Sequence, residues 1–278
     1  MKIEKNILKG DGIDFIKSPN HGGKFTQEYP DTIVLHYTAG SSAESSIRTL
    51  CNPKYKASAH LVVGRNGSVS QLVPFDTVAW HAGRSTYEGR SGYNKFSIGI
   101  EIDNAGPLTK RGNGYAAWFG KIYPADEVIG AIHPNESQSK FWQCYTEEQI
   151  EKVYEICNLL CDTYEMKNIL GHEEISPGRK TDPGPAFPLE QLRRHILIHD
   201  RDEEGPEEFE LLDTTSNYGI VTANKLNIRS GPGTHMDKAG SPLEKGDKVE
   251  IVGENDGWYE VNVKTKGWVS KDYISVYY

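Results

Sequence analysis

Two histidines and one aspartate have residue types and positions that suit a metal centre. His36 ends a short apolar run, His172 follows a second one, and Asp182 lies on a nearby loop rich in glycine and proline. Two neutral imidazoles and one carboxylate suit a catalytic zinc ion, because they leave a fourth position open for water. His36 lies far upstream of the other two residues, so only folding can bring the three side chains together.

Two further residues complete the groups that metal-assisted amide hydrolysis requires. The segment SIGIEID, 97–103, reads as a strand whose isoleucines share one face, which places Glu101 on the other face. A carboxylate there can take a proton from water and pass it to a leaving amine. Lys180 precedes Asp182 by two residues and can meet a developing oxyanion. The ordinary alternatives are a solvated strand residue for Glu101 and a surface lysine for Lys180.

Local patterns in the first 200 residues indicate strands that alternate with helices. Apolar runs predict strands over 31–37, 97–103 and 168–170, and Asn-Gly at 66–67 predicts a hairpin over 60–73. A short helix is expected over 41–50, capped by Ser41 or Ser42. Thr146 and Gln149 form a capping-box pattern at the start of a helix over 146–166. These elements predict an α/β domain over 1–200.

Three other segments differ in character from this domain. The stretch of about 105–145 is long and rich in glycine and aromatic residues, and loops of this length are usually functional or disordered. Residues 200–213 hold eight acidic residues against one arginine, which predicts a solvated acidic linker over 201–213. Short β-runs separated by turn residues predict a small all-β barrel over 214–278.

Composition excludes several functional classes. The net charge is −8 and no basic stripe is present, so nucleic acid is not an expected partner. No run approaches the ~20 apolar residues that a membrane span needs. No signal peptide is visible at the start, which fits cytoplasmic synthesis with release to the cell wall, or a secreted or periplasmic protein whose signal has been removed. The four cysteines form no CxxC pair and require no oxidising compartment.

Five blocks of the first domain resemble the type-2 N-acetylmuramoyl-L-alanine amidases, which are zinc enzymes related to peptidoglycan recognition proteins and to the amidase-type phage lysozyme. The blocks are IVLHYTAG, SAHLVVGRNGSVSQLV, AWHAG, SIGIEI and GHEEISPGRKTDPGPAF, in that order, within about residues 25–195. The resemblance implies one Zn²⁺ held by His36, His172 and Asp182, with Glu101 as the catalytic carboxylate and Lys180 stabilising the oxyanion. It also implies a central mixed β-sheet with helices on its faces.

The same resemblance implies the substrate and the residues that contact it. The amide bond to be hydrolysed is the one between the lactyl group of N-acetylmuramic acid and the L-alanine of the stem peptide, in peptidoglycan or in a muropeptide. His81, Arg65, Arg90 and Asn94 fall where relatives contact substrate. Alternatively, His81, like His60, is a buried structural histidine, and the two arginines are surface residues. In the long insertion, Trp118 and Phe119 either wall the groove or cover the edge of the sheet.

The tail resembles the bacterial SH3-like domain through LNIRSGPGT (226–234), GWYEV (257–261) and GWVSKDYI (267–274). This resemblance implies a small β-barrel that is commonly a cell-wall targeting unit. Trp258, Tyr259 and Tyr273 are candidates for an aromatic surface that faces peptide. Alternatively, Trp258 and Trp268 are core residues of the small barrel. The sequence does not decide whether the module targets the wall or docks on the amidase groove.

The prediction is therefore a monomeric zinc amidase of the peptidoglycan cell wall with an SH3-like module. The alternative is a recognition protein that binds muropeptide without cutting it, and such relatives typically lack the acidic or thiol ligand, which this chain keeps as Asp182. A scaffold built on the SH3-like tail is a third hypothesis. The sequence leaves open intact wall or released anhydro-muropeptide as substrate, the preferred stem peptide, and a lytic, recycling or scavenging role.

Overall fold

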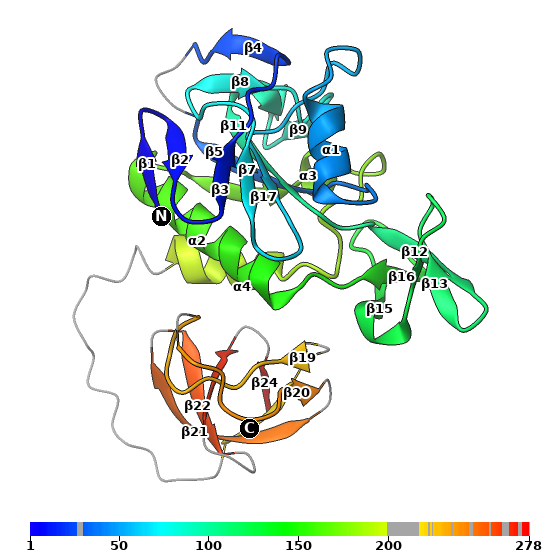
Figure 1. Ribbon diagram of the computed structural model, residues 1–278, viewed down its shortest axis with the longest axis vertical. Helices are drawn as coiled ribbons and strands as arrows, with labels where there is room; N and C mark the ends of the chain where they lie inside the picture. The colour runs from blue at the N-terminus through cyan, green and yellow to red at the C-terminus, as the bar shows by residue number, and fades with distance from the viewer. Residues whose placement is uncertain are drawn as a thin grey trace. The chain divides into compact units, whose positions relative to one another are not determined.

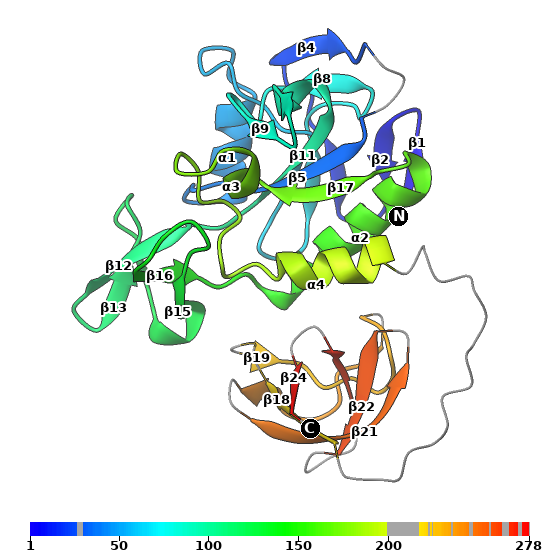
Figure 2. The ribbon, with the colours of Figure 1, turned by 180° about the vertical axis from the view of Figure 1, so that it is seen from behind.

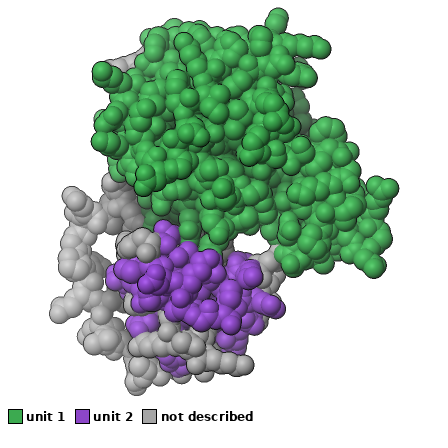
Figure 3. Space-filling view, viewed as in Figure 1, with its two compact units in different colours: residues 1–197 green, residues 198–278 purple. Residues whose placement is uncertain are grey.

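The computed structural model describes residues 1–26, 30–198, 217–221, 223, 225–234, 236–244, 247–255, 257–262, 267–271 and 274–277. The chain forms two compact units, Met1–Leu197 and Ile198–Tyr278, which Figure 3 colours separately. The expected linker, 201–213, lies outside the described residues, so the domain limits of 1–200 and 214–278 stay predictions. No helix within the described ranges is long and apolar enough to cross a membrane.

A six-stranded mixed sheet forms the centre of the first unit (Figure 1). Its order is β17-β5-β11-β6-β7-β3, and all neighbours run parallel except the β6–β7 hairpin. The strands are β3 (Ile13–Phe15), β5 (Thr32–Tyr37), β6 (Leu61–Val63), β7 (Val69–Gln71), β11 (Ser97–Ile102) and β17 (Asn168–Gly171). Gly67 supplies the positive φ that the predicted hairpin turn requires. The mixed sheet expected from the resemblance is confirmed.

Two helices cover this sheet, which lies between them in both Figure 1 and Figure 2. Helix α1 (Ala43–Leu50) begins at Ser42, whose hydroxyl accepts from the Ser45 N–H, and it packs on Val62 of β6. Helix α2 (Glu147–Thr163) begins with the predicted capping box and buries Ile150, Val153, Ile156, Cys157 and Leu160. Two short helices follow β17, namely α3 (His172–Ile175) and α4 (Leu189–Arg193), and a π-helical turn, η3 (Arg194–Ile198), ends the unit.

The register of the three parallel strands β17, β5 and β11 builds the site. Glu101 lies directly opposite His36, and Gly171 lies opposite Leu35, so His172 begins just beyond the end of β17. The apolar residues of these strands are almost completely buried, which fixes the register, because a slip of one residue would turn every side chain to the other face. The carboxyl ends of three strands thus place chemically active side chains at one edge of the sheet.

The long insertion is a folded sheet, which the sequence did not predict. Its order is β14-β13-β12-β16-β15, and every neighbouring pair is antiparallel. Trp142 is only 1% exposed, and a small core gathers around Ala105, Leu108 and Tyr123. The elements are β12 (Pro107–Arg111), β13 (Gly114–Ala116), β14 (Ile122–Tyr123), η2 (Ala125–Glu127), β15 (Val128–Ile132) and β16 (Ser139–Gln143).

The remaining elements of the first unit are short strand pairs and one 3-10 turn. Strands β1 (Lys2–Glu4) and β2 (Ile7–Lys9) form a hairpin, β4 (His21–Lys24) pairs with β8 (Thr77–Ala79), and β9 (Thr86–Tyr87) pairs with β10 (Arg90–Ser91). A 3-10 turn, η1 (Tyr93–Lys95), leads into β11. The segment between β8 and β11 matters for the site, because it carries His81, Ala82 and Asn94.

The second unit is built from strands, as predicted. Five strands pair in the order β23-β22-β21-β18-β24, and β19 pairs with β20. Their bounds are β18 (Asn217–Val221), β19 (Lys225–Leu226), β20 (Leu243–Glu244), β21 (Lys248–Asn255), β22 (Trp258–Asn262), β23 (Gly267–Ser270) and β24 (Ile274–Tyr277). Trp258 and Tyr259 are partly exposed on β22, whereas the predicted contact residue Tyr273 lies outside the described residues.

Candidate active site

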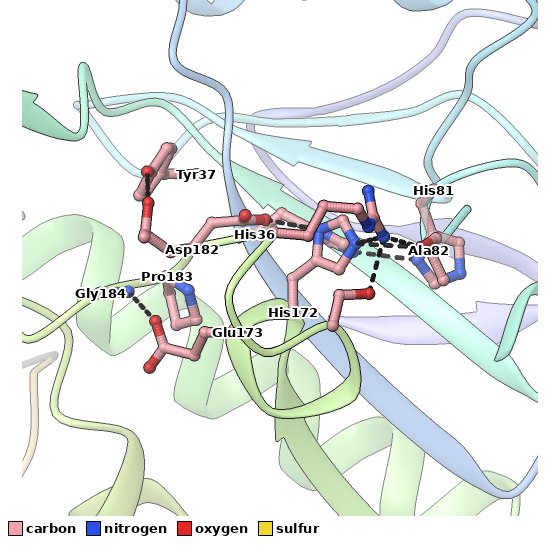
Figure 4. A network of polar contacts seen from close by, with 12 residues as sticks. His36, Tyr37, His81, Ala82, His172, Glu173, Asp182, Pro183 and Gly184 are labelled. Atoms are coloured by element: carbon pink, nitrogen blue, oxygen red, sulfur yellow. Dashed lines mark hydrogen bonds and ion pairs between the residues drawn. The ribbon is translucent and has the colours of Figure 1, made fainter. Parts of the chain in front are cut away.

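His36, His172 and Asp182 meet in one buried cluster (Figure 4). The Nδ1 atom of His36 lies 2.9 Å from Nδ1 of His172 and 2.8 Å from Oδ2 of Asp182. The third side of the triangle, between His172 Nδ1 and Asp182 Oδ2, is 2.9 Å long. The fold therefore brings together the three side chains that the sequence singled out, and each presents one atom to a common point.

The partner of the outer nitrogen of His172 identifies which nitrogen carries the proton. His172 Nε2 lies 3.0 Å from the carbonyl oxygen of Ala82. A carbonyl oxygen can only accept, so Nε2 carries the hydrogen and donates it. In the neutral ring the other nitrogen, Nδ1, then holds a lone pair, and that lone pair faces His36 and Asp182.

A second chain of contacts assigns His36 in the same way. His81 Nε2 lies 3.3 Å from the carbonyl oxygen of Ser97, whose own hydroxyl donates to the Tyr93 carbonyl, so His81 carries its proton on Nε2. His81 Nδ1 is then an acceptor, and it lies 3.0 Å from His36 Nε2, which must donate. His36 therefore also directs an Nδ1 lone pair into the cluster.

Three electron-pair donors facing one another at 2.8–2.9 Å require a positive charge between them. Burial, together with His172, lowers the pKa of His36 to about 4, so its ring is neutral at pH 7. A proton can join only one pair of these atoms, whereas a divalent cation can accept all three, so the donor set fits a metal ion.

Glu101 lies in the same pocket, on the strand beside His36. Burial, with a smaller contribution from the charge of Asp182, raises its pKa from 4.5 to about 8, and Lys180 partly opposes the rise. Among the described residues, its buried Oε2 atom has no hydrogen-bond partner. A buried carboxyl with a raised pKa and a free oxygen is the form that a general acid–base group takes.

The pocket has a polar lining that includes residues the sequence reasoning missed. Lys180 lines it as predicted, together with Tyr37, Arg179 and Thr181. The Tyr37 hydroxyl lies 2.6 Å from Oγ1 of Thr181 and so ties the end of β5 to the loop that carries Asp182. Each missed residue is next to a predicted one in the sequence, and that adjacency was the available signal.

The loop between His172 and Asp182 is held by the insertion. The buried His133 donates from Nε2 to Oε2 of Glu173 at 2.8 Å, and the same oxygen accepts the Gly184 N–H at 3.0 Å. The Glu173 N–H in turn donates to the carbonyl oxygen of Asp182 at 2.9 Å. No sequence signal links His133 to Glu173, because their pairing depends on how the insertion sheet docks.

Three of the predicted substrate-contact residues are engaged away from the pocket. Arg65 donates to the carbonyl of Cys144 and to Gln149, and Arg90 forms a two-point ion pair with Asp31. Asn94 Oδ1 accepts two backbone N–H groups, and none of the three residues lines the pocket. We propose that all three hold loops, because each is already engaged with other groups of the protein.

His81 and Trp118 lie closer to the pocket. His81 lines it, but both of its ring nitrogens are paired with protein groups, while His60 is fully buried between Gly99 and Thr77 as a structural histidine. Trp118 is 78% exposed, and its indole N–H donates at 2.7 Å to the carbonyl of Ala39, which lines the pocket. Trp118 thus lies at the pocket rim with its ring open to solvent.

The mixed sheet, the buried metal-ligand cluster and the adjacent carboxyl define a hydrolase. Residues 26–185 match the family model described as N-acetylmuramoyl-L-alanine amidase, and residues 224–275 match the bacterial SH3 domain. The chain belongs to the N-acetylmuramoyl-L-alanine amidase family and carries a C-terminal bacterial SH3 domain. The predicted family, fold class and enzyme class are therefore confirmed.

Two curated relatives agree with this assignment. The chain is 35% identical over 212 residues to the 1,6-anhydro-N-acetylmuramyl-L-alanine amidase AmpD of Escherichia coli K12, covering 69% of this chain and 96% of that protein. It is 33% identical over 169 residues to the N-acetylmuramoyl-L-alanine amidase AmiD of the same organism, covering 58% and 51%. A solved complex of Escherichia coli AmiD with anhydro-N-acetylmuramic acid-L-Ala-D-gamma-Glu-L-Lys is 31% identical, with coverage of 61% and 59% and a TM-score of 0.45.

Proposed function

We propose that this chain is a zinc-dependent N-acetylmuramoyl-L-alanine amidase that releases stem peptides from muropeptides. The bond cut joins the lactyl group of N-acetylmuramic acid to L-alanine. His36, His172 and Asp182 hold the zinc ion, Glu101 is the catalytic carboxylate, and Lys180 stabilises the oxyanion.

The observation that carries this proposal is the triangle of three lone pairs beside a buried carboxyl. The two imidazoles turn their Nδ1 atoms toward the same Asp182 oxygen at 2.8 and 2.9 Å. Mixed nitrogen and oxygen donors from two histidines and one carboxylate suit zinc, and three protein ligands leave room for substrate chemistry. Glu101 and Lys180 line the same pocket, so the groups for hydrolysis adjoin the metal ligands.

A zinc ion bound there would supply Lewis acidity and lower the pKa of water in the pocket. Glu101 accepts the proton of the attacking water and returns it to the nitrogen of the departing L-alanine, so the same group acts as base and then as acid. Lys180 donates to the carbonyl oxygen as negative charge develops on it. Tyr37 and Thr181, held together by their hydroxyl groups, fix the loop that presents Lys180.

Released anhydro-muropeptides are the first substrates to test. Several curated relatives are named as amidases of 1,6-anhydro-N-acetylmuramyl-L-alanine. Trp118 offers an exposed aromatic face at the pocket rim, where a sugar ring can pack against it. The SH3 domain suits contact with intact wall, so both substrate forms belong in the assay.

A muropeptide-binding protein without activity is the alternative. Simple recognition gives no reason to bury a carboxyl with an unpaired oxygen, since such a group destabilises the folded protein. Glu101 is such a group, and it lies in the pocket with the metal ligands. This observation favours catalysis.

Mass spectrometry of the products tests the proposal. Purified anhydro-muropeptide and purified sacculi are incubated separately with the zinc-loaded protein, with the protein plus a chelator, and with the Glu101→Gln variant. Free stem peptides that begin with L-alanine should appear only with zinc-loaded wild-type protein. If zinc-loaded wild-type protein leaves both the anhydro-muropeptide and the sacculi uncut, the proposal is wrong. Products cut at another bond would contradict the assigned reaction.

A further inference from the structure

One two-residue segment contacts the outer nitrogens of both histidine ligands. His81 Nδ1 lies 3.0 Å from His36 Nε2, and the Ala82 carbonyl oxygen lies 3.0 Å from His172 Nε2 (Figure 4). The dipeptide His81–Ala82 therefore accepts one hydrogen from each imidazole. In doing so it leaves the Nδ1 atoms of both rings as lone-pair donors to the metal site.

A single side-chain atom holds this dipeptide in place. Oδ1 of Asn94 accepts the backbone N–H of His81 at 3.0 Å and that of Ala82 at 2.7 Å. Asn94 lies in the 3-10 turn that leads into β11, the strand that carries Glu101. The same amide oxygen thus fixes the backbone of the dipeptide, and the contacts of His81 with His36 and of Ala82 with His172 depend on that backbone.

Gly99 provides independent support, because it leaves space for the His81 ring. A Cβ atom at Gly99 would lie 2.3 Å from Cγ and 2.5 Å from Nδ1 of His81. Gly99 is two residues before Glu101 on β11, so the strand beside the metal site is shaped to seat this imidazole. Both ring nitrogens of His81 are paired with protein groups, which leaves neither one for substrate.

We propose that Asn94 is a positioning residue of the metal site. It holds the His81–Ala82 dipeptide, which in turn fixes the tautomer and the orientation of His36 and His172. Asn94 touches neither the metal ligands nor the pocket, so it acts only through that dipeptide. This inference rests on the proposed zinc site and adds a residue on which zinc affinity depends.

Zinc affinity of three variants tests the inference. Asn94→Ala removes the acceptor, whereas Asn94→Asp keeps an oxygen in the same place. Asn52→Ala is the matched control, because Asn52 Oδ1 also accepts a backbone N–H, from Lys54, on an exposed loop away from the site. Loss of a partner that orients a metal ligand typically costs about 10–100-fold in affinity.

The expected pattern separates positioning from simple loop capping. Asn94→Ala should raise the zinc dissociation constant, measured by competition with a chelating dye, by at least about tenfold, while Asn94→Asp and Asn52→Ala stay within about threefold of wild type. In proton–nitrogen NMR spectra of the zinc-loaded protein, the slowly exchanging Nε2–H signals of His36 and His172 should persist in wild type and Asn94→Asp. They should exchange rapidly with solvent in Asn94→Ala.

If Asn94→Ala does not fold, His81→Ala removes the acceptor of His36 directly and should show the same loss of affinity. Wild-type affinity in the folded Asn94→Ala or His81→Ala protein would overturn the positioning role and leave the proposed function intact. Failure of wild-type protein to bind zinc would overturn both. The two proposals therefore fail in different ways.

Discussion

Replacing Glu101 with glutamine should stabilise the metal-free protein while it stops turnover. The carboxyl is buried in the pocket, its Oε2 has no hydrogen-bond partner among the described residues, and its pKa is raised from 4.5 to about 8. Burial is the main cause of the rise, and the charge of Asp182 adds to it. A glutamine has nearly the same shape and carries no charge at any pH, so it removes this cost.

The pH dependence follows from the direction of the shift. A carboxyl whose pKa is higher in the folded state binds protons more tightly there, so its ionisation lowers the free energy of unfolding as pH rises from 4.5 to 8. At about 1.4 kcal/mol per pH unit, the cost is near zero at pH 4, about 3 kcal/mol at pH 7, and at most about 5 kcal/mol above pH 8. The stability gained in the Glu101→Gln variant should grow over the same interval.

Urea unfolding in the presence of a chelator measures this gain at pH 5, 7 and 8.5. The control is Glu148→Gln, an exposed glutamate on α2, whose replacement should change the free energy of unfolding by less than about 0.5 kcal/mol at every pH. Metal-loaded Glu101→Gln should lose at least about a hundredfold in kcat, because an amide cannot accept the water proton that we assign to the Glu101 carboxylate. A stability gain that is the same at pH 5 and pH 8.5, or a loss of stability, would refute the argument that the ionised carboxyl is buried at a cost.

Three further predictions concern the metal, the rim and the insertion. Asp182→Ala should lower the zinc content after desalting from one ion per chain to near zero, because two imidazoles alone bind zinc poorly. Retained zinc would mean that another residue is the third zinc ligand. Trp118→Ala should lower kcat/KM on anhydro-muropeptide about tenfold with little change in melting temperature and zinc content, since the ring is largely exposed and is proposed to pack on substrate. Unchanged kcat/KM on both muropeptide and sacculi would contradict the rim contact. His133→Leu should lower the free energy of unfolding at pH 7 by about 3 kcal/mol and weaken zinc binding, because it leaves the buried Glu173 carboxyl without its imidazole partner and with only the Gly184 N–H. Wild-type zinc affinity in the folded variant would mean that the insertion does not hold the loop between His172 and Asp182.

The sequence by itself determined the elements whose patterns are local. Apolar alternation and capping residues predicted β5, the β6–β7 hairpin, β11 and α2, and the structure places each close to its predicted position. His36, His172 and Glu101 were also found from the sequence, because each directly follows or lies within such an apolar run, whereas Asp182 was found on the glycine- and proline-rich loop that comes after His172. Parallel strands then bring these positions to one edge of the sheet, as the register of Glu101 with His36 shows.

The insertion was beyond the reach of local patterns. Its strands are short, glycine interrupts them, and their pairing joins segments such as Pro107–Arg111 and Ser139–Gln143 across a long stretch of chain. Strand pairing of this kind is stabilised by contacts between distant residues, and Trp142 is buried only when the sheet has formed. The sequence showed a glycine- and aromatic-rich stretch, and nothing in it predicted the His133–Glu173 pair.

The tertiary structure alone decided which partners the residues around the three candidate metal ligands have. The sequence placed His81 and Asn94 among substrate contacts, but a hydrogen bond has a donor and an acceptor, and these depend on partners far away in the chain. His36 meets His81, His172 meets Ala82, and Asn94 holds both members of that dipeptide. Residue types could name the atoms able to bind a metal, whereas only packing determines which nitrogen of each imidazole carries the proton.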